Sequence, residues 1–242
     1  METINIRYLF KLPDNQQEII DLHLDPVTLD LMNAIPKRIP FWAKLDFCRC
    51  PNCRLDVQSY PNCPIAVHLV KLLEMFQTLL SYETVHVDII TPQRTISKET
   101  SAQKSLSSVM GLIMATSGCP HMEFFKPMAR FHLPLASAEE TIYRASSMYL
   151  LAQYFLRKEG QEADLDLEGL KKIYENIQTL NVAMFKRLQC TCDKDVAVNS
   201  LTILDVFAQT LPFVIEKSLE EIRYIFLPYL SHQKKQDKNK VH

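Results

Sequence analysis

Four of the seven cysteines in this chain lie within sixteen residues, at Cys48, Cys50, Cys53 and Cys63. Cys50 and Cys53 enclose a Cys-Pro-Asn-Cys turn, and the triplet Pro-Asn-Cys occurs again ending at Cys63. A Cys-x-x-Cys turn directs two sulfurs at one ion, and the thiolate is the form that binds metal. The repeated triplet therefore predicts that the two turns hold parts of the same metal site.

Zinc is the metal that we expect at such a site. Structural zinc takes four ligands in a tetrahedron with Zn–S bonds of about 2.3 Å, so neighbouring sulfurs lie about 4 Å apart. The cysteine spacing matches none of the common iron–sulfur patterns. The fourth ligand is Cys48 or, from further along the chain, Cys119. The competing interpretation is a set of reduced, packed thiols without a metal.

A second group of reactive side chains falls in the segment 119–134. It contains four residues with possible roles in binding or catalysis: Cys119, His121, Arg130 and His132. In an enzyme, Cys119 would be a metal ligand or nucleophile, His121 or His132 an acid or base, and Arg130 a clamp for a small anion. On this interpretation Arg130 and His132 share a cavity near Cys119. On a purely structural one, the apolar residues of the segment pack and Arg130 pairs with a neighbouring glutamate.

Composition excludes several functional classes. The chain has 242 residues, a formal net charge of −1 and only four glycines. It lacks the glycine patterns of the dinucleotide fingerprint and the Walker A loop. The near-neutral charge gives no indication of nucleic-acid binding. The longest plainly apolar run, at 109–115, is far short of the roughly 20 residues that a membrane span needs. We expect a cytoplasmic protein without a signal peptide.

Alternating apolar residues predict two β-hairpins in the first hundred residues. The first has strands at 3–11 and 18–24, and the second has strands at 84–90 and 94–98. Between them, Pro64 suits the first turn of a helix, which places Cys63 at or near its N-cap. We expect residues 1–99 to form a β-rich region that includes the cysteine cluster and this one helix.

From about residue 100 the apolar residues recur at helical spacing. Helices are expected after Thr100, Ser137, Asp166 and Asp193, and a last one from Pro212. Ser137 and Glu140 have the spacing of a capping box. Prolines at 120, 127 and 134 predict an irregular segment between the first two helices. The fold class is therefore α+β, with a helical bundle at 100–231 and a disordered basic tail at 232–242. The alternative to this division is one compact domain overall.

The chain resembles a family of uncharacterised bacterial proteins. The resemblance is carried by Ser-Gly-Cys-Pro at 117–120, Pro-Met-Ala-Arg-Phe-His-Leu-Pro at 127–134, Cys53, Cys63-Pro64 and the run at 148–155. It extends through most of the chain and implies a stand-alone bacterial protein. It brings no activity, ligand or fold.

We therefore expect a cytosolic metal-binding protein, with zinc as its cofactor, acting as a binding or regulatory module. Its candidate metal ligands are Cys48, Cys50, Cys53, Cys63 and Cys119. The first alternative is a metal- or thiol-dependent enzyme whose site is the segment 119–134. The second is a metal-free interaction protein. We expect neither a nucleic-acid partner nor a membrane, and Arg130 is the place for a small anionic ligand.

Overall fold

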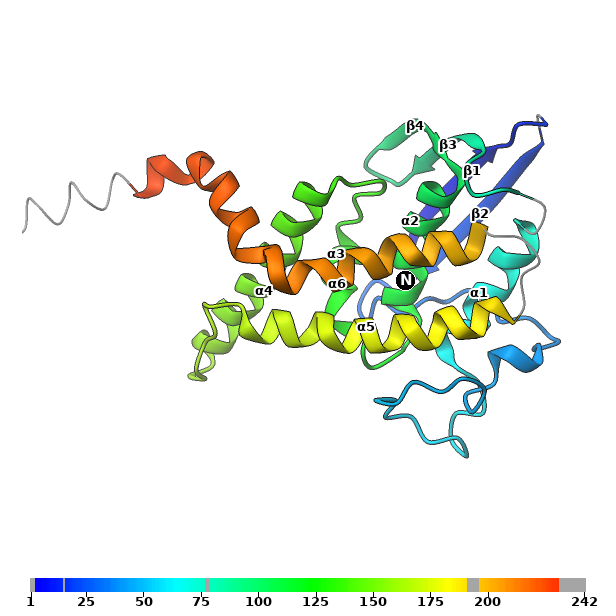
Figure 1. The fold of residues 1–242 in the computed structure, drawn as a ribbon, viewed down its shortest axis with the longest axis horizontal. Helices are drawn as coiled ribbons and strands as arrows, with labels where there is room; N and C mark the ends of the chain where they lie inside the picture. The colour runs from blue at the N-terminus through cyan, green and yellow to red at the C-terminus, as the bar shows by residue number, and fades with distance from the viewer. Residues whose placement is uncertain (1–2, 15, 77–78, 191–195, 231–242) are drawn as a thin grey trace, which may run out of the picture.

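The computed structural model describes residues 3–14, 16–76, 79–190 and 196–230. The predicted basic tail at 232–242 and the predicted helix start at Asp193 lie outside these residues. Within them the predicted α+β class is confirmed, because an N-terminal antiparallel sheet is followed by a series of helices. Figure 1 shows the sheet at one end of the molecule and the long helices running away from it.

The sheet has four strands in the order β2-β1-β3-β4. Both predicted hairpins are present, and β1 joins them by pairing antiparallel with β3. Alternate residues of β1 point inward, so that Tyr8 and Phe10 are fully buried. This is the period-two pattern of a strand with one buried face. The strands are β1 (Ile4–Lys11), β2 (Gln17–Leu24), β3 (Thr84–Ile90) and β4 (Thr95–Ser101).

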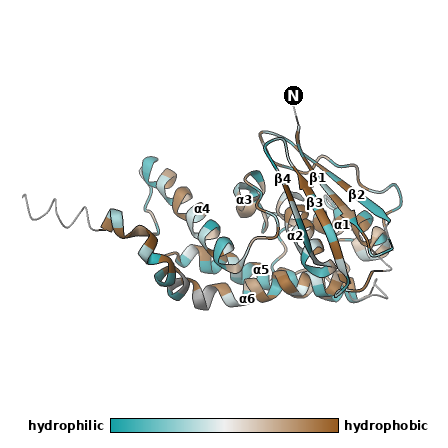
Figure 2. Cartoon of the chain, turned by 90° about the horizontal axis from the view of Figure 1, so that it is seen from above, coloured by the Kyte–Doolittle hydropathy of each residue, from teal (hydrophilic) through white to brown (hydrophobic). Residues whose placement is uncertain are grey.

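Helices α1 (Pro64–Met75) and α2 (Ala102–Thr116) lie against one face of this sheet, as Figure 2 shows. The ring of Phe10 packs edge-on against that of Phe76, with 4.9 Å between centroids. One continuous apolar core includes residues of the sheet and of the later helices. Buried apolar surface therefore joins the β-rich and helical parts.

Three long helices follow residue 137 in the part of the chain that the structure describes. Helix α4 begins with the predicted capping box, in which the backbone N–H of Glu140 donates to Ser137 Oγ and that of Ser137 to the Glu140 carboxylate. Helices α5 and α6 run side by side in both ribbon views (Figures 1 and 2). Their bounds are α4 (Ala138–Lys158), α5 (Glu168–Gln189) and α6 (Val196–Ile222), and the 3₁₀ turns are η1 (Phe41–Ala43) and η3 (Arg223–Phe226).

The segment 119–134 is more regular than its prolines suggest. It contains a 3₁₀ turn, η2 (Glu123–Phe125), and a short helix, α3 (Lys126–Arg130). Pro127 lies in the first turn of α3, where a helix leaves its N–H groups unpaired in any case. The proline therefore starts this helix instead of preventing it.

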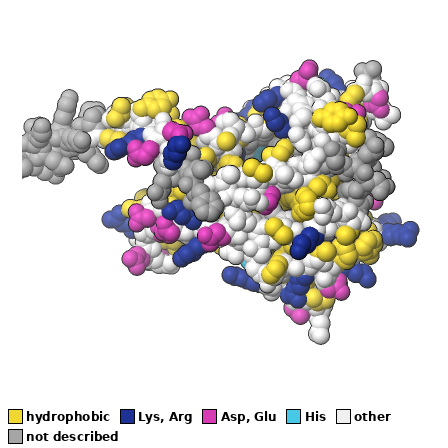
Figure 3. Space-filling model, in the orientation of Figure 1, with side chains coloured by type: hydrophobic (Ala, Val, Ile, Leu, Met, Phe, Trp, Pro, Cys, Tyr) yellow, Lys and Arg dark blue, Asp and Glu magenta, His cyan; other side chains and the backbone are white. Residues whose placement is uncertain are grey.

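The surface is mixed in charge. Figure 3 shows Lys and Arg side chains interspersed with Asp and Glu over the visible face. Of the helices that the structure describes, none has the length and apolar character needed to cross a membrane.

Helix α6 differs from the sequence prediction, because it continues through Pro212 where we expected one helix to end and another to begin. A proline has no N–H, so Pro212 leaves the carbonyl of Ala208 without its usual intrahelical donor. The side-chain amide of Gln178, on α5, donates to this carbonyl at 3.0 Å. A partner from the adjacent helix thus satisfies the group that the proline leaves unpaired.

This replacement predicts a coupling between Gln178 and Pro212. We expect Gln178→Leu to lower the free energy of unfolding by about 1 kcal/mol, because the Ala208 carbonyl loses its partner. In a Pro212→Ala background the restored N–H supplies the donor, so Gln178→Leu should cost less than about half as much. Urea denaturation of the four proteins measures both costs. Equal costs in the two backgrounds would contradict the account.

Candidate functional site

Four cysteines from separate parts of the chain line one small cavity. Its walls include Cys50, Cys53, Cys63 and Cys119, and its volume is about 20 Å³. A space of this size holds one ion or one water molecule and has no room for an organic substrate. Cys48 does not line it and has a left-handed backbone, with φ of 45°. Of the two candidates for a fourth ligand, Cys119 lies at the cavity.

The backbone around the first three cysteines is hydrogen-bonded in place. The N–H of Cys53 donates to the carbonyl of Cys50 at 3.0 Å, which closes the Cys-Pro-Asn-Cys turn. Cys63 is the N-cap of α1, as predicted, and its N–H donates to the carbonyl of Ala43 at 2.8 Å. Both turns line the same cavity, at the N-terminal end of α1.

Cys119 reaches the cavity because the chain reverses after α2. Gly118 has φ of 82°, in the left-handed region that glycine adopts without strain. Nε2 of His121 lies 2.7 Å from the carbonyl oxygen of Asn52, inside the Cys50–Cys53 turn. His121, which also lines the cavity, thus ties the loop after α2 to the first cysteine turn.

The thiols influence one another electrostatically. The pKa of the Cys119 thiol is raised to about 12, mainly by burial and also by the nearby Cys63 and Cys50, while hydrogen bonds from the His121 and Met122 N–H groups act in the opposite direction. Burial raises the pKa of Cys50 to about 11, with contributions from Cys63 and Cys53.

A buried arginine completes the wall of this cavity. Arg187, on α5, is only 2% exposed and lines the cavity beside the four thiols. Its guanidinium donates to the backbone carbonyls of Trp42 and Lys44 and lies 5.7 Å from the ring centroid of Phe47. Its Nε has no hydrogen-bond partner among the described residues. Its positive charge also lowers the pKa of Cys50.

Sequence reasoning missed Arg187. The available indication was its helical phase, because residue 187 falls on the same buried face of α5 as Leu180 and Met184. A charged residue in that phase needs partners inside the protein.

The thiols do not form a finished metal centre as they stand. In the part of the chain that the structure describes, no three or more His, Cys, Asp or Glu side chains are grouped so that they could hold a metal ion. The four thiols nevertheless surround one space. Convergence of their sulfurs on one point would require movement of the thiol side chains.

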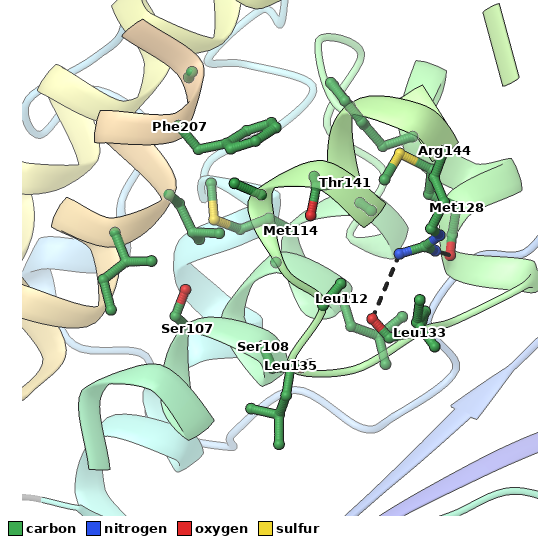
Figure 4. Close-up of a pocket in the computed structure, with 18 of the residues that line it drawn as sticks. Ser107, Ser108, Leu112, Met114, Met128, Leu133, Leu135, Thr141, Arg144 and Phe207 are labelled. Atoms are coloured by element: carbon green, nitrogen blue, oxygen red, sulfur yellow. Dashed lines mark hydrogen bonds between the residues drawn. The ribbon is translucent and has the colours of Figure 1, made fainter. Parts of the chain in front are cut away.

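A second cavity, of about 730 Å³, lies among the helices. Its walls come from β4, α2, α4, α5, α6 and the segment around α3, and Figure 4 shows part of them. His132 lines this cavity and not the cysteine cavity. Arg130 lines neither, because α3 turns Ala129 inward and leaves Arg130 exposed over the ring of Phe131. The expectation that Arg130 and His132 share a cavity near Cys119 does not match this geometry.

His132 is held by a buried hydrogen-bond chain. Its Nε2 lies 2.5 Å from the hydroxyl of Tyr8, and that hydroxyl lies 3.1 Å from Oγ of Ser108. Burial, assisted by the positive charge of Arg144, lowers the pKa of His132 to about 3. At neutral pH the imidazole is therefore uncharged.

Comparison with known proteins places the chain in one family. Residues 6–227 match the model of a domain of unknown function, DUF6901. No curated protein and no solved structure shows a significant match to the chain. The resemblance to an uncharacterised family, expected from the sequence, is confirmed at this level.

The pKa of His132 predicts a loss of stability in acid. The ordinary pKa of histidine is 6.5, and the pKa of His132 in the folded protein is about 3. Between these values the unfolded chain binds a proton that the folded chain does not, so stability falls as pH falls below about 6.5. We expect this residue to contribute up to about 1.4 kcal/mol of lost stability per pH unit. Urea unfolding at pH 7 and pH 4.5 should show that His132→Gln loses less stability between these pH values than the wild type does.

The matched control is His23→Gln, because His23 is an exposed histidine on β2. A His132→Gln protein that loses as much as the wild type would refute the assignment of this effect to His132.

Proposed function

Because the chain belongs to the DUF6901 family, whose description states no function, we propose from its own geometry that it is a zinc-binding protein. Cys50, Cys53, Cys63 and Cys119 are the ligands. The observation that carries the proposal is that these four thiols, from three separate stretches of the chain, line one cavity of about 20 Å³. Four thiolates are a common ligand set of structural zinc.

The charge of the cavity wall supports this ligand set. Four thiolates around Zn²⁺ leave a net negative charge, which is costly to bury without compensation. Arg187 brings a buried positive charge to the wall, and its Nε is an unused donor. A donor of this kind suits a thiolate sulfur, because metal sites are commonly supported by hydrogen bonds to their ligands.

The size and composition of the cavity favour a structural zinc ion over a catalytic one. Four protein ligands close the coordination shell, whereas a catalytic site keeps a position for water or substrate. The ion would join the Cys-rich loop, the start of α1 and the loop after α2. We therefore favour a cytosolic binding or regulatory module. The enzyme alternative is weakened by the exposed position of Arg130 and the separate location of His132.

Elemental analysis tests the proposal directly. Protein purified under reducing conditions should contain about one zinc per chain, and Cys53→Ser/Cys63→Ser should retain less than about a tenth of it. Cys48→Ser and Cys190→Ser are the matched controls, because neither residue lines the cavity, and both variants should keep their zinc. Wild-type protein that is folded and reduced, yet binds no zinc when zinc is added, would favour the metal-free alternative.

The role of Arg187 gives a second prediction. Arg187→Met should weaken zinc binding by about tenfold or more, because it removes the compensating charge and the free donor. Arg187→Lys keeps the charge and should recover part of the affinity. Competition with a chromophoric chelator measures both, and circular dichroism verifies that the variants are folded. An unchanged zinc affinity in Arg187→Met would show that Arg187 does not support the metal site.

A further inference from the structure

The large cavity has the dimensions of a small-molecule site. Its volume of about 730 Å³ falls within the roughly 300–1,000 Å³ usual for ligand pockets. Most of its wall is apolar, and the side chains that form it include Met114, Met128, Ile177, Leu204 and Phe207. Figure 4 shows the labelled members of this wall, with Met114 and Phe207 at one side and Met128 and Arg144 at the other.

One polar side chain in this wall lacks a partner. Asn181, on α5, is 1% exposed, and neither its Nδ2 nor its Oδ1 makes a hydrogen bond within the described residues. A buried amide with both ends unpaired is costly, so native proteins rarely keep one without a function or a bound molecule. Its natural complement is a group that both donates and accepts, such as a hydroxyl.

One positive charge in the wall forms no close ion pair among the described residues. Arg144, on α4, donates to the backbone carbonyls of Met128 at 2.9 Å and Phe131 at 3.0 Å, and more weakly to that of Leu133 at 3.4 Å (Figure 4). None of the ion pairs formed by the described residues includes it. The Glu140 carboxylate, in the same wall, interacts with Arg144 electrostatically, but it accepts the N–H of Ser137 and forms no ion pair with the guanidinium. The hydrogen bonds that position the guanidinium come from neutral carbonyls, so an anion can still pair with it.

The two polar groups lie at different places along the cavity. Arg144 interacts electrostatically with Glu140, on its own helix, and with Tyr174, on α5. Tyr174 and Asn181 are seven residues apart on the buried face of α5, with Ile177 between them. At about 1.5 Å rise per residue, this separates them by about 10 Å along the helix axis. A ligand touching both ends therefore needs an apolar body between its polar groups.

We propose that this cavity binds an amphipathic carboxylic acid that carries a hydroxyl group away from its carboxylate. The carboxylate lies at Arg144, the apolar body lies along the methionine and phenylalanine side chains, and the hydroxyl pairs with Asn181. This site is separate from the cysteine cavity, and its proposal does not depend on zinc.

Calorimetric titration with three probes tests the proposal: decanoate, ω-hydroxydecanoate and decanol. The wild type should bind ω-hydroxydecanoate about fivefold more tightly than decanoate, because of the Asn181 contact. It should bind decanol about tenfold more weakly than decanoate, because the charge at Arg144 is unused. Failure of all three probes to bind at millimolar concentration would overturn the proposal.

Two asparagine variants on α5 test the hydroxyl contact. Asn181→Leu should abolish the preference for the hydroxylated probe and leave decanoate binding nearly unchanged. It should also raise the melting temperature of the ligand-free protein, because an unpaired amide is removed. Asn176→Leu is the matched control, since Asn176 bonds to Asn52 and does not line the cavity. Its preference should equal that of the wild type.

Two results with Asn181→Leu would overturn the proposal. An Asn181→Leu protein that keeps the hydroxyl preference would overturn the assignment of Asn181. A lower melting temperature together with no binding of any probe would mean that ordered water satisfies the amide, and would also overturn the proposal. Arg144→Lys, which keeps the charge, should still discriminate decanoate from decanol.

Discussion

The arrangement of the cysteine site depends on one buried guanidinium. Arg187 is almost fully enclosed, and a charge in such a place is stable only when its N–H groups have partners. The partners are the carbonyls of Trp42 and Lys44, so the chain around η1 must lie against α5. The same stretch receives the N–H of Cys63 through Ala43. Backbone hydrogen bonding therefore brings the cysteine turns to α5 before any metal is considered, and a zinc ion would add to a scaffold that already exists.

The positions of the strands and most helices were readable from local pattern, because each is determined by short-range periodicity and capping. The alternation in β1 and β3 and the capping box at Ser137 are examples. The continuity of α6 was not readable. Its unpaired carbonyl at Ala208 is satisfied by Gln178, thirty residues away on another helix. A proline in the sequence shows only what is lost locally, whereas the compensating donor comes from tertiary packing.

The residues of the candidate sites also include some that local sequence indicated and some that it did not. Spacing indicated Cys50, Cys53 and Cys63, and left Cys48 and Cys119 as alternatives for the fourth ligand. Of these two, Cys119 lines the cavity with the other three and Cys48 does not. Sequence reasoning did not identify Arg187 or Asn181, although both fall on the buried face of α5. Polar residues in an apolar helical phase were the available indication. Grouping Arg130 with His132 rested on proximity in sequence. Arg130 ends α3 with its side chain exposed, whereas His132, two residues later, lines the large cavity.

The central claim is that one zinc ion is held by four sulfurs. X-ray absorption spectroscopy at the zinc edge of the purified protein measures the identity and distance of the coordinating atoms directly. The account predicts a first shell of four sulfur atoms at about 2.3 Å, with no oxygen or nitrogen neighbour. A first shell of nitrogen and oxygen atoms at about 2.0–2.1 Å, or a mixture with fewer than three sulfurs, would contradict it.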